Sequence, residues 1–162
     1  MEWGPDQLGR PRRASNLTFV QGDAHQLELP DASFDLVYTR YVLEHVAEPE
    51  RVVREMRRVA RPGARVIACE NDISLMRLDP PGPAFEAAWV GLARLQQSLG
   101  GDALIGRRLF RLFRGAGFAD VELSVQPEVH WAGSPGFVAW VGVFIGNIGG
   151  ARRGNGAGMS TP

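Results

Sequence analysis

Lysine is absent from the sequence: all 18 basic residues are arginines, and 18 acidic residues balance them to a formal net charge of zero. A chain without excess charge has no general electrostatic attraction for nucleic acid or for an anionic membrane. We therefore expect neither of these as a partner. The codon usage of a GC-rich genome explains the lack of lysine better than a role in recognition does.

Cysteine and long apolar runs are scarce as well. The single cysteine, Cys69, excludes an intramolecular disulfide and a thiolate metal cluster. No apolar run approaches the ~20 residues that a membrane-spanning helix needs, and residues 1–20 lack the pattern of a signal peptide. The 162 residues suit one domain with a core of its own. These features predict a cytoplasmic protein without a bound metal.

Two short runs of β-forming residues, 17–20 and 34–38, predict buried strands, because each is too short for a helix and is bounded by turn-forming residues. Polar residues and then a helical pattern follow both runs, as in the strand–loop–helix units of a parallel sheet. Ligands of open α/β sheets bind beyond the carboxyl ends of the strands. Asp23, Thr39 and Arg40 are therefore the first candidates for a binding site.

The rest of the chain adds further predicted elements. They are helices at 42–46, 49–61, 84–99, from Asp102 to about Ala116, and at 137–148, and strands at 65–70 and 121–125. We expect an irregular segment over 1–16, one partial domain over 17–148 and a disordered tail over 149–162. In the helix at 49–61 the apolar residues share one face, and the arginines are expected to point to solvent.

Several motifs occur in an order that is known from one enzyme family. They are Val20-Gln-Gly-Asp-Ala24, Ser33-Phe-Asp-Leu-Val37, Val42-Leu-Glu-His-Val46 and Glu55-Met-Arg-Arg-Val-Ala-Arg-Pro-Gly63. Together they resemble class I S-adenosylmethionine-dependent methyltransferases, most closely the small-molecule enzymes with a type 11 domain. The resemblance implies a Rossmann-like α/β sheet, the cofactor S-adenosyl-L-methionine, and methyl transfer to a small-molecule acceptor.

The resemblance also assigns residues to the adenine part of the cofactor. Asp23 would accept a hydrogen bond from the adenine amino group, as suits a group that only accepts, and the Ala24 amide would meet a ring nitrogen. Gly22 would let the backbone approach the ring. Leu29 would pack on the adenine, although a place in the ordinary core explains this leucine equally well.

Thr39 and Arg40 would lie beside the methionine part of the cofactor, where a cation can meet the carboxylate. Thr39-Arg40-Tyr41 stands where methyltransferases of bases carry (Asp/Asn)-Pro-Pro-(Tyr/Phe). This difference argues against a DNA substrate. The region 71–106 would form the acceptor pocket, and its Met76, Phe85 and Trp89 indicate an apolar or aromatic acceptor.

Methyl transfer depends mainly on holding two small molecules in register, so it requires no covalent catalysis. If a general base exists, Glu70, Asp72 and His130 are weak candidates. Histidine is the natural choice because it titrates near neutral pH, yet His130 could also be a structural histidine. His25 is a weaker candidate, and His45 is better explained by a structural role.

Parts of the resembled fold are missing from the sequence. The first forty residues contain no G-x-G-x-G turn, and no acidic residue is placed to hold the ribose. The run at 17–20 would be the third strand, without its neighbours. We therefore expect an incomplete sheet, an N-terminally truncated chain, possible self-association through unpaired sheet edges, and weak or no binding of S-adenosylmethionine. The alternatives are a true short protein whose strands pair differently, and a non-catalytic methyltransferase-like module that binds a protein partner.

Overall fold

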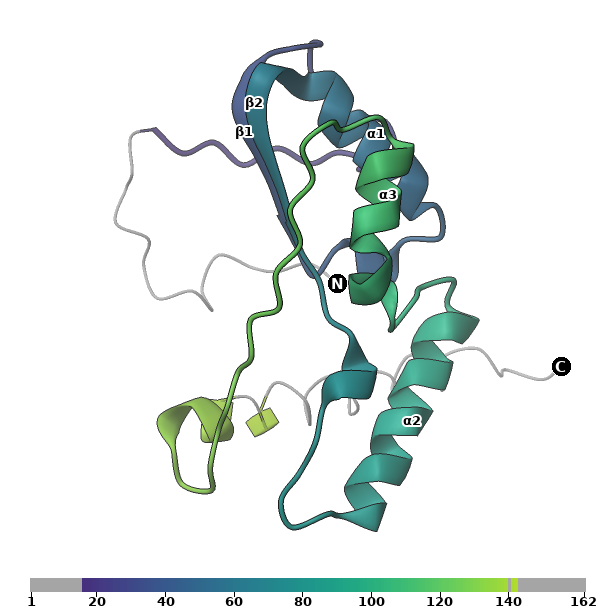
Figure 1. Cartoon of the computed structure of the whole chain (residues 1–162), viewed down its shortest axis with the longest axis vertical. Helices are drawn as coiled ribbons and strands as arrows, with labels where there is room; N and C mark the ends of the chain where they lie inside the picture. Colours follow the sequence, from purple (N-terminus) through teal and green to yellow (C-terminus); the bar gives the residue numbers. More distant parts are fainter. Residues whose placement is uncertain (1–15, 140, 143–162) are drawn as a thin grey trace, which may run out of the picture.

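The computed structural model describes residues 16–139, 141 and 142 (Figure 1). The elements in chain order are β1 (Phe34–Arg40), η1 (Leu43–His45), α1 (Pro49–Val59), β2 (Ala60–Cys69), η2 (Ile73–Leu75), α2 (Pro83–Ser98), η3 (Ile105–Arg108) and α3 (Leu109–Gly115), where η marks a 3₁₀-helix.

The two strands form a parallel sheet, with Val37 paired to Val66 and Arg40 paired to Cys69. Helix α1 connects them, which is the usual crossover between parallel strands. The α/β class predicted from the sequence is confirmed, with two strands in the described part of the sheet. The prediction of an incomplete sheet agrees with this architecture.

The core lies on one face of this sheet. Leu43, Val53 and Ile105 are fully buried there, and Figure 1 shows α1 and α3 side by side on the same side of the strands. Pro49 starts α1 at a position where a proline suits a helix, and Gly117, with φ +88°, allows the turn that follows α3. The predicted apolar face of α1 is confirmed by the burial of Val52, Val53, Met56 and Val59.

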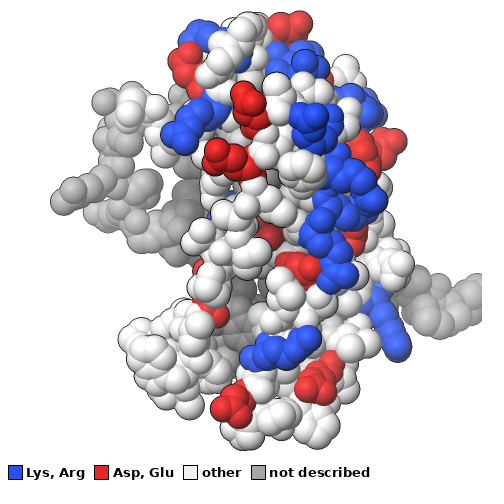
Figure 2. Space-filling model, in the orientation of Figure 1, with Lys and Arg blue, Asp and Glu red and all other residues white. Residues whose placement is uncertain are grey.

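Helix α2 buries no residue and lies away from the strands (Figure 1). The indole Nε1 of Trp89 donates a hydrogen bond of 2.8 Å to the Ile73 carbonyl and so ties α2 to η2. The ring of Phe85 stacks on that of Trp89 at a centroid distance of 5.7 Å. Figure 2 shows arginines on the side of the molecule where α1 and α3 lie, and Arg51, Arg54 and Arg57 of α1 are exposed as predicted. For Arg58 the prediction is wrong, because its side chain is partly buried and donates to the carbonyl oxygens of the loop before β1.

Two predicted strands are wrong. Residues 17–20 and 121–125 belong to no strand in the structure. Phe19 is 86% exposed and Val125 is 72% exposed. A β-forming run becomes a strand only if a neighbour takes its backbone hydrogen bonds, and neither run has such a neighbour in the described part of the chain. Propensity alone therefore did not decide these segments.

The other predictions differ from the structure mainly at the ends of elements. The helices predicted at 49–61 and 84–99 are confirmed, and the strand predicted at 65–70 begins earlier, at Ala60. Of the helix predicted at 42–46, Leu43–His45 form the short 3₁₀-helix η1. The helix predicted at 137–148 is confirmed for residues 137–139, 141 and 142, which are helical. The remainder of that segment, residues 1–15 and the predicted tail lie outside the described residues.

Candidate functional site

Polar residues from both strands meet at the carboxyl edge of the sheet. Thr39 and Arg40 end β1, and Glu70 directly follows β2. The parallel register pairs Arg40 with Cys69, and the Tyr41 amide donates to the Cys69 carbonyl at 3.0 Å. The structure therefore brings three of the predicted site residues to one edge.

Glu70 organises the chain that leaves β1. Its Oε1 accepts hydrogen bonds from the amides of Val42 and Leu43, both at 3.1 Å, and its Oε2 accepts one from the Glu44 amide at 3.3 Å. Burial raises the pKa of Glu70, while these amide hydrogen bonds act in the opposite direction. Because both oxygens are engaged, the geometry assigns Glu70 an anchoring role and makes it a poor general base.

Thr39 and Arg40 offer different groups to a ligand. The Thr39 hydroxyl oxygen is buried and has no hydrogen-bond partner among the described residues. Arg40 is half-exposed; it donates to the Tyr41 hydroxyl at 3.1 Å, and its guanidinium lies 4.7 Å from the centre of the Tyr41 ring. A buried hydroxyl without a partner is unfavourable, so the Thr39 hydroxyl is an unsatisfied group of this edge.

Glu128 connects Arg40 with the candidate base His130. Its Oε1 lies 3.7 Å from Arg40 Nη2, and its Oε2 lies 3.8 Å from His130 Nε2. The His130 ring packs on the backbone of Gly136, where a Cβ atom would come within 2.6 Å of Nδ1. Our sequence reasoning missed Glu128. Its spacing of two residues from His130 in an extended segment was the available signal, because such residues share one side.

The predicted adenine residues lie on a loop that is held by α1. The Leu27 amide donates to Glu55 Oε2 at 2.9 Å, and the Arg51 Nε donates to the His25 carbonyl at 3.1 Å. Arg58 donates to the carbonyl oxygens of Leu27 and Leu29. The loop is thus fixed although it contains little regular structure.

Within this loop, Asp23 keeps one oxygen available. Its Oδ1 accepts from the His25 amide at 2.9 Å and lies 2.8 Å from His25 Nδ1, while Oδ2 has no partner among the described residues. The hydrogen bonds from the backbone and ring of His25 lower the pKa of Asp23. Ala24 packs against the core, Leu29 is partly buried, and Gly22 is exposed with open space around it.

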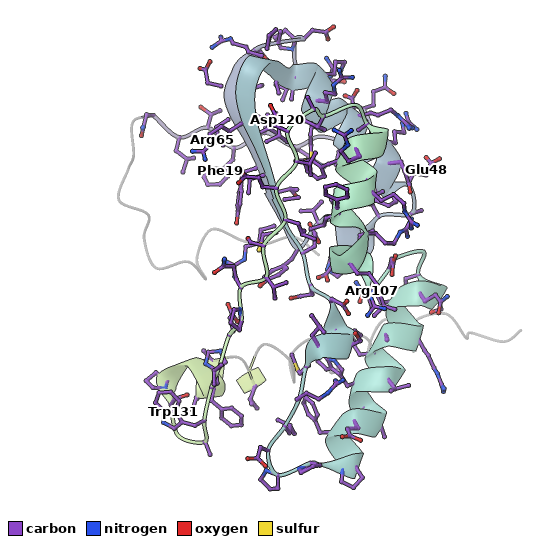
Figure 3. The ribbon with its side chains drawn as sticks, viewed as in Figure 1. Phe19, Glu48, Arg65, Arg107, Asp120 and Trp131 are labelled. Carbon is purple, nitrogen blue, oxygen red and sulfur yellow. The ribbon has the colours of Figure 1, made fainter. Side chains whose placement is uncertain are left out.

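The predicted site residues therefore form two groups. In the described part of the chain, no hydrogen bond or ion pair joins the Asp23 loop to Thr39 or Arg40. The third candidate base, Asp72, caps η2 and pairs with Arg107, whose Nε lies 2.7 Å from Asp72 Oδ2. Figure 3 shows Arg107 where the start of α3 approaches η2. The hydrogen bond from Arg107 lowers the pKa of Asp72. This engagement fits a structural role.

A cavity of about 570 Å³ lies next to η1, between α2 and the start of α1. Apolar atoms of Val46, Ile73 and Trp89 line it together with the charged side chains of Arg94 and Arg108. The Nε of Arg108 is buried and has no hydrogen-bond partner among the described residues. The cavity belongs to the predicted acceptor region, but Met76 and Phe85 do not line it.

The residues present fit part of S-adenosylmethionine. Asp23 Oδ2 suits an amino group, and the Thr39 hydroxyl suits a polar group at the strand edge. Among residues 16–139, 141 and 142, no group of three or more His, Cys, Asp or Glu side chains could hold a metal ion. None of the described helices is long and apolar enough to cross a membrane.

Comparisons with known proteins find similarity to methyltransferases. Residues 5–68 match the family described as a methyltransferase domain. An uncharacterized 37.1 kDa protein in transposon TN4556 of Streptomyces fradiae is 39% identical over 111 residues, which are 67% of this chain and 32% of that protein.

Two further relatives carry methyltransferase names. The ubiquinone/menaquinone biosynthesis C-methyltransferase of Hahella chejuensis is 39% identical over 70 residues, 43% of this chain and 28% of the relative. The demethylmenaquinone methyltransferase of Geobacillus is 29% identical over 132 residues, 73% of this chain and 56% of the relative. The chain spans less than two thirds of the length of each of these relatives. These matches support the resemblance seen in the motifs: residues 5–68 are similar to a methyltransferase domain, and the two relatives with methyltransferase names are similar to this chain over part of their length.

Proposed function

We propose that this chain takes part in methyl transfer from S-adenosyl-L-methionine to a small acceptor with an aromatic ring. The observation that carries this proposal is the edge at the ends of β1 and β2. There, Glu70 fixes the amides of residues 42–44 and the buried Thr39 hydroxyl has no partner among the described residues. The match of residues 5–68 to the methyltransferase domain family supports the same function.

Binding of the cofactor would use two groups of residues. Asp23 Oδ2 would accept a hydrogen bond from the adenine amino group, and the neighbouring amide of Ala24 would contact the ring. Thr39 and Arg40 would contact the methionine part, where the guanidinium attracts the carboxylate. When bound, the cofactor supplies an electrophilic methyl group on its sulfonium sulfur.

His130 is the residue that we propose as general base. Of the three candidates, Glu70 and Asp72 use both of their oxygens within the fold. The His130 ring lies 3.8 Å from a carboxylate oxygen of Glu128 and is two-thirds buried. Because the other two candidates are engaged in the fold, the His130 imidazole is the group left to accept a proton from the acceptor.

The cavity beside α2 is the proposed acceptor pocket. Trp89 supplies an aromatic surface, and the Arg94 guanidinium can attract an acidic hydroxyl of the acceptor. Two nitrogens of Arg108 already pair with Asp102 and Glu50, so Arg108 offers its Nε alone. A planar ring that carries an oxygen fits this lining. The name of the Geobacillus relative refers to demethylmenaquinone, a molecule of this chemical kind.

Calorimetry with S-adenosylmethionine tests the cofactor assignment. We expect weak but saturable binding, because the sequence lacks a G-x-G-x-G turn in its first forty residues. Asp23→Ala should weaken this binding by about tenfold or more, since a hydrogen bond to a charged group contributes roughly 1.5–3 kcal/mol. Glu28→Gln is the matched control, because Glu28 is an exposed carboxylate in the same loop.

The absence of saturable binding would contradict the catalytic proposal. It would favour a second candidate function, a non-catalytic module that binds a protein partner. The exposed apolar residues Leu36, Tyr38 and Ile67 support this second function. If binding is present, transfer of a labelled methyl group to demethylmenaquinone that has first been chemically reduced to its hydroquinone, whose ring is nucleophilic, tests the acceptor class. His130→Gln should then lower the rate without weakening cofactor binding.

A further inference from the structure

Arg58 uses its whole guanidinium to hold the loop before β1. Its Nε donates to Glu55 Oε1 at 2.9 Å, and its Nη2 donates to Glu55 Oε2 at 2.8 Å and to the Leu27 carbonyl at 2.9 Å. Its Nη1 donates to the Leu29 carbonyl at 2.8 Å and to Asp31 Oδ1 at 2.6 Å. A guanidinium carries five N–H donors in a fixed fork. These contacts therefore give every donor of Arg58 an acceptor.

Glu55 holds the same loop from the acceptor side. Its Oε2 also accepts a hydrogen bond from the Leu27 amide at 2.9 Å, so both backbone groups of Leu27 are bound to side chains of α1. The side chains of Glu55 and Arg58 are only 17% and 30% exposed. The hydrogen bond from Arg58 lowers the pKa of Glu55, so this carboxylate stays charged at neutral pH. Charge-assisted hydrogen bonds are stronger than neutral ones. We refer to Arg58 and Glu55 together as the clamp.

One turn connects Asp23 to the clamp. The Gln26 amide donates to the Asp23 carbonyl at 3.0 Å, and Leu27 follows Gln26 directly. The His25 amide tightens the turn, because it donates to Asp23 Oδ1 at 2.9 Å. Arg51 adds one hydrogen bond from α1, to the His25 carbonyl, but its side chain is half-exposed. A shift of Leu27 would therefore move the turn as a unit, and Asp23 Oδ2 with it.

We propose that Arg58 is a positioning residue for the cofactor: through Glu55 and Leu27, it holds Asp23 Oδ2 at the place where the adenine amino group binds. This inference rests on the proposed binding of S-adenosylmethionine. A loop that is held in place before binding loses less conformational entropy when the ligand arrives. Lysine cannot take over this role, because its ammonium carries three donors on one nitrogen and lacks the planar fork.

Calorimetry on the full chain, with S-adenosylmethionine as the ligand, tests whether Arg58 acts through Asp23. Arg58→Lys should weaken binding by about three- to tenfold, at most the loss expected for Asp23→Ala. In an Asp23→Ala background the same substitution should change the affinity by less than about twofold, because the group that it positions is already gone. A general weakening of the fold would lower the affinity by the same factor in both backgrounds. Arg54→Lys is the matched control, because Arg54 is an exposed arginine of the same helix.

An analogue of S-adenosylmethionine with hypoxanthine in place of adenine gives a second measurement. Hypoxanthine carries a carbonyl oxygen where adenine carries the amino group, so it cannot donate to Asp23 Oδ2. The unaltered protein should therefore prefer the adenine form. Arg58→Lys should reduce this preference, whereas a loss of structure elsewhere would weaken the binding of both forms alike.

Urea unfolding and circular dichroism check that each variant is folded at the temperature of the binding experiment. If Arg58→Lys does not fold, Glu55→Gln replaces it in both measurements. Glutamine keeps an acceptor for the Leu27 amide but loses the charge and one of the two acceptors for Arg58.

Equal losses of affinity in the two backgrounds would overturn the role of Arg58, and so would an unchanged affinity of a folded clamp variant. Both results leave the proposed function intact, because the unaltered protein still binds the cofactor. The absence of saturable binding by the unaltered protein would contradict the proposed function and this role together.

Discussion

The two faces of the β1–β2 sheet differ sharply. On one face, Val37, Val66 and Ala68 pack against the core that α1 and α3 complete. On the other face, Leu36, Tyr38 and Ile67 are exposed, although they are as apolar as their neighbours. Figure 3 shows Phe19 and Arg65 on this open side of the strands, away from α1 and α3. Strands that are apolar on both faces are typical of parallel sheets that are covered on both sides.

The residues of the two strands and the helices that cover them do not match. The sequence of β1 and β2 suits burial on both faces, but the described helices cover only one. The stability of the fold therefore depends on the covered face. The following predictions test this division of roles, beginning with the largest expected effect.

Loss of the Phe113 side chain should be the most damaging change. Phe113 is 7% exposed in the core, so Phe113→Ala leaves a cavity and should lower the free energy of unfolding by about 3–5 kcal/mol. Phe110→Ala is the matched control, because Phe110 belongs to the same helix but is 47% exposed. Urea unfolding followed by circular dichroism gives both values. Equal losses would show that the core does not lie where α3 meets α1.

The Glu70 anchor should have the next largest effect. Glu70→Ala leaves the amides of Val42, Leu43 and Glu44 without their acceptor. We expect a loss of about 1–3 kcal/mol in the free energy of unfolding, because water reaches this half-buried site and replaces part of the lost hydrogen bonds. Glu128→Ala, at an exposed position of the same edge, is the control. Unchanged stability of the Glu70 variant would mean that η1 is held by other contacts.

Acid should weaken the attachment of η2. The pKa of Asp72 is lowered by Arg107 and Ser74, so the unfolded chain binds a proton more readily than the folded one. The stability that this carboxylate contributes is present above the ordinary pKa of aspartate and is lost as the pH falls through the lowered value.

We expect a contribution of about 1 kcal/mol, because Arg107 is half-exposed. Urea unfolding of the wild type and of Asp72→Asn, at neutral pH and at a pH below the lowered pKa, measures this contribution. The two proteins should differ near neutral pH and converge in acid. The contribution of Glu70 to the free energy of unfolding depends on pH in the opposite direction. Because the pKa of Glu70 is raised, this contribution is present below the ordinary pKa of glutamate and is lost as the pH rises through the raised value. A difference for Asp72→Asn that stays constant with pH would contradict the assignment.

Sequence reasoning predicted the local structure well wherever local signals decide it. The proline at position 49, the apolar face of α1 and the strand–helix alternation gave α1, α2, β1 and β2. It failed for 17–20 and 121–125, because pairing with a distant strand, and not composition, makes a strand. For 17–20 the motifs had indicated that the neighbouring strands are missing, but the strand itself was predicted from composition alone.

The candidate site was predictable to a similar degree. The positions of Thr39, Arg40 and Glu70 at one edge follow from the parallel topology, which the motifs indicated. The contacts of individual atoms do not follow from the topology. That Glu70 binds three amides and that Glu128 lies between Arg40 and His130 depends on how the loop after β2 and the segment after α3 pack.

The smallest effect is expected on the open face, where Ile67→Thr should change the free energy of unfolding by at most about 0.5 kcal/mol. Ile67 is 43% exposed, so the substitution removes little buried surface. Val66→Thr is the matched control: the neighbouring residue packs against the core, and its new hydroxyl should cost about 1–3 kcal/mol. Urea unfolding at low protein concentration measures both without a contribution from association. Val66→Thr should be clearly the less stable of the two. A loss for Ile67→Thr as large as that for Val66→Thr would show that the open face is covered within a single chain.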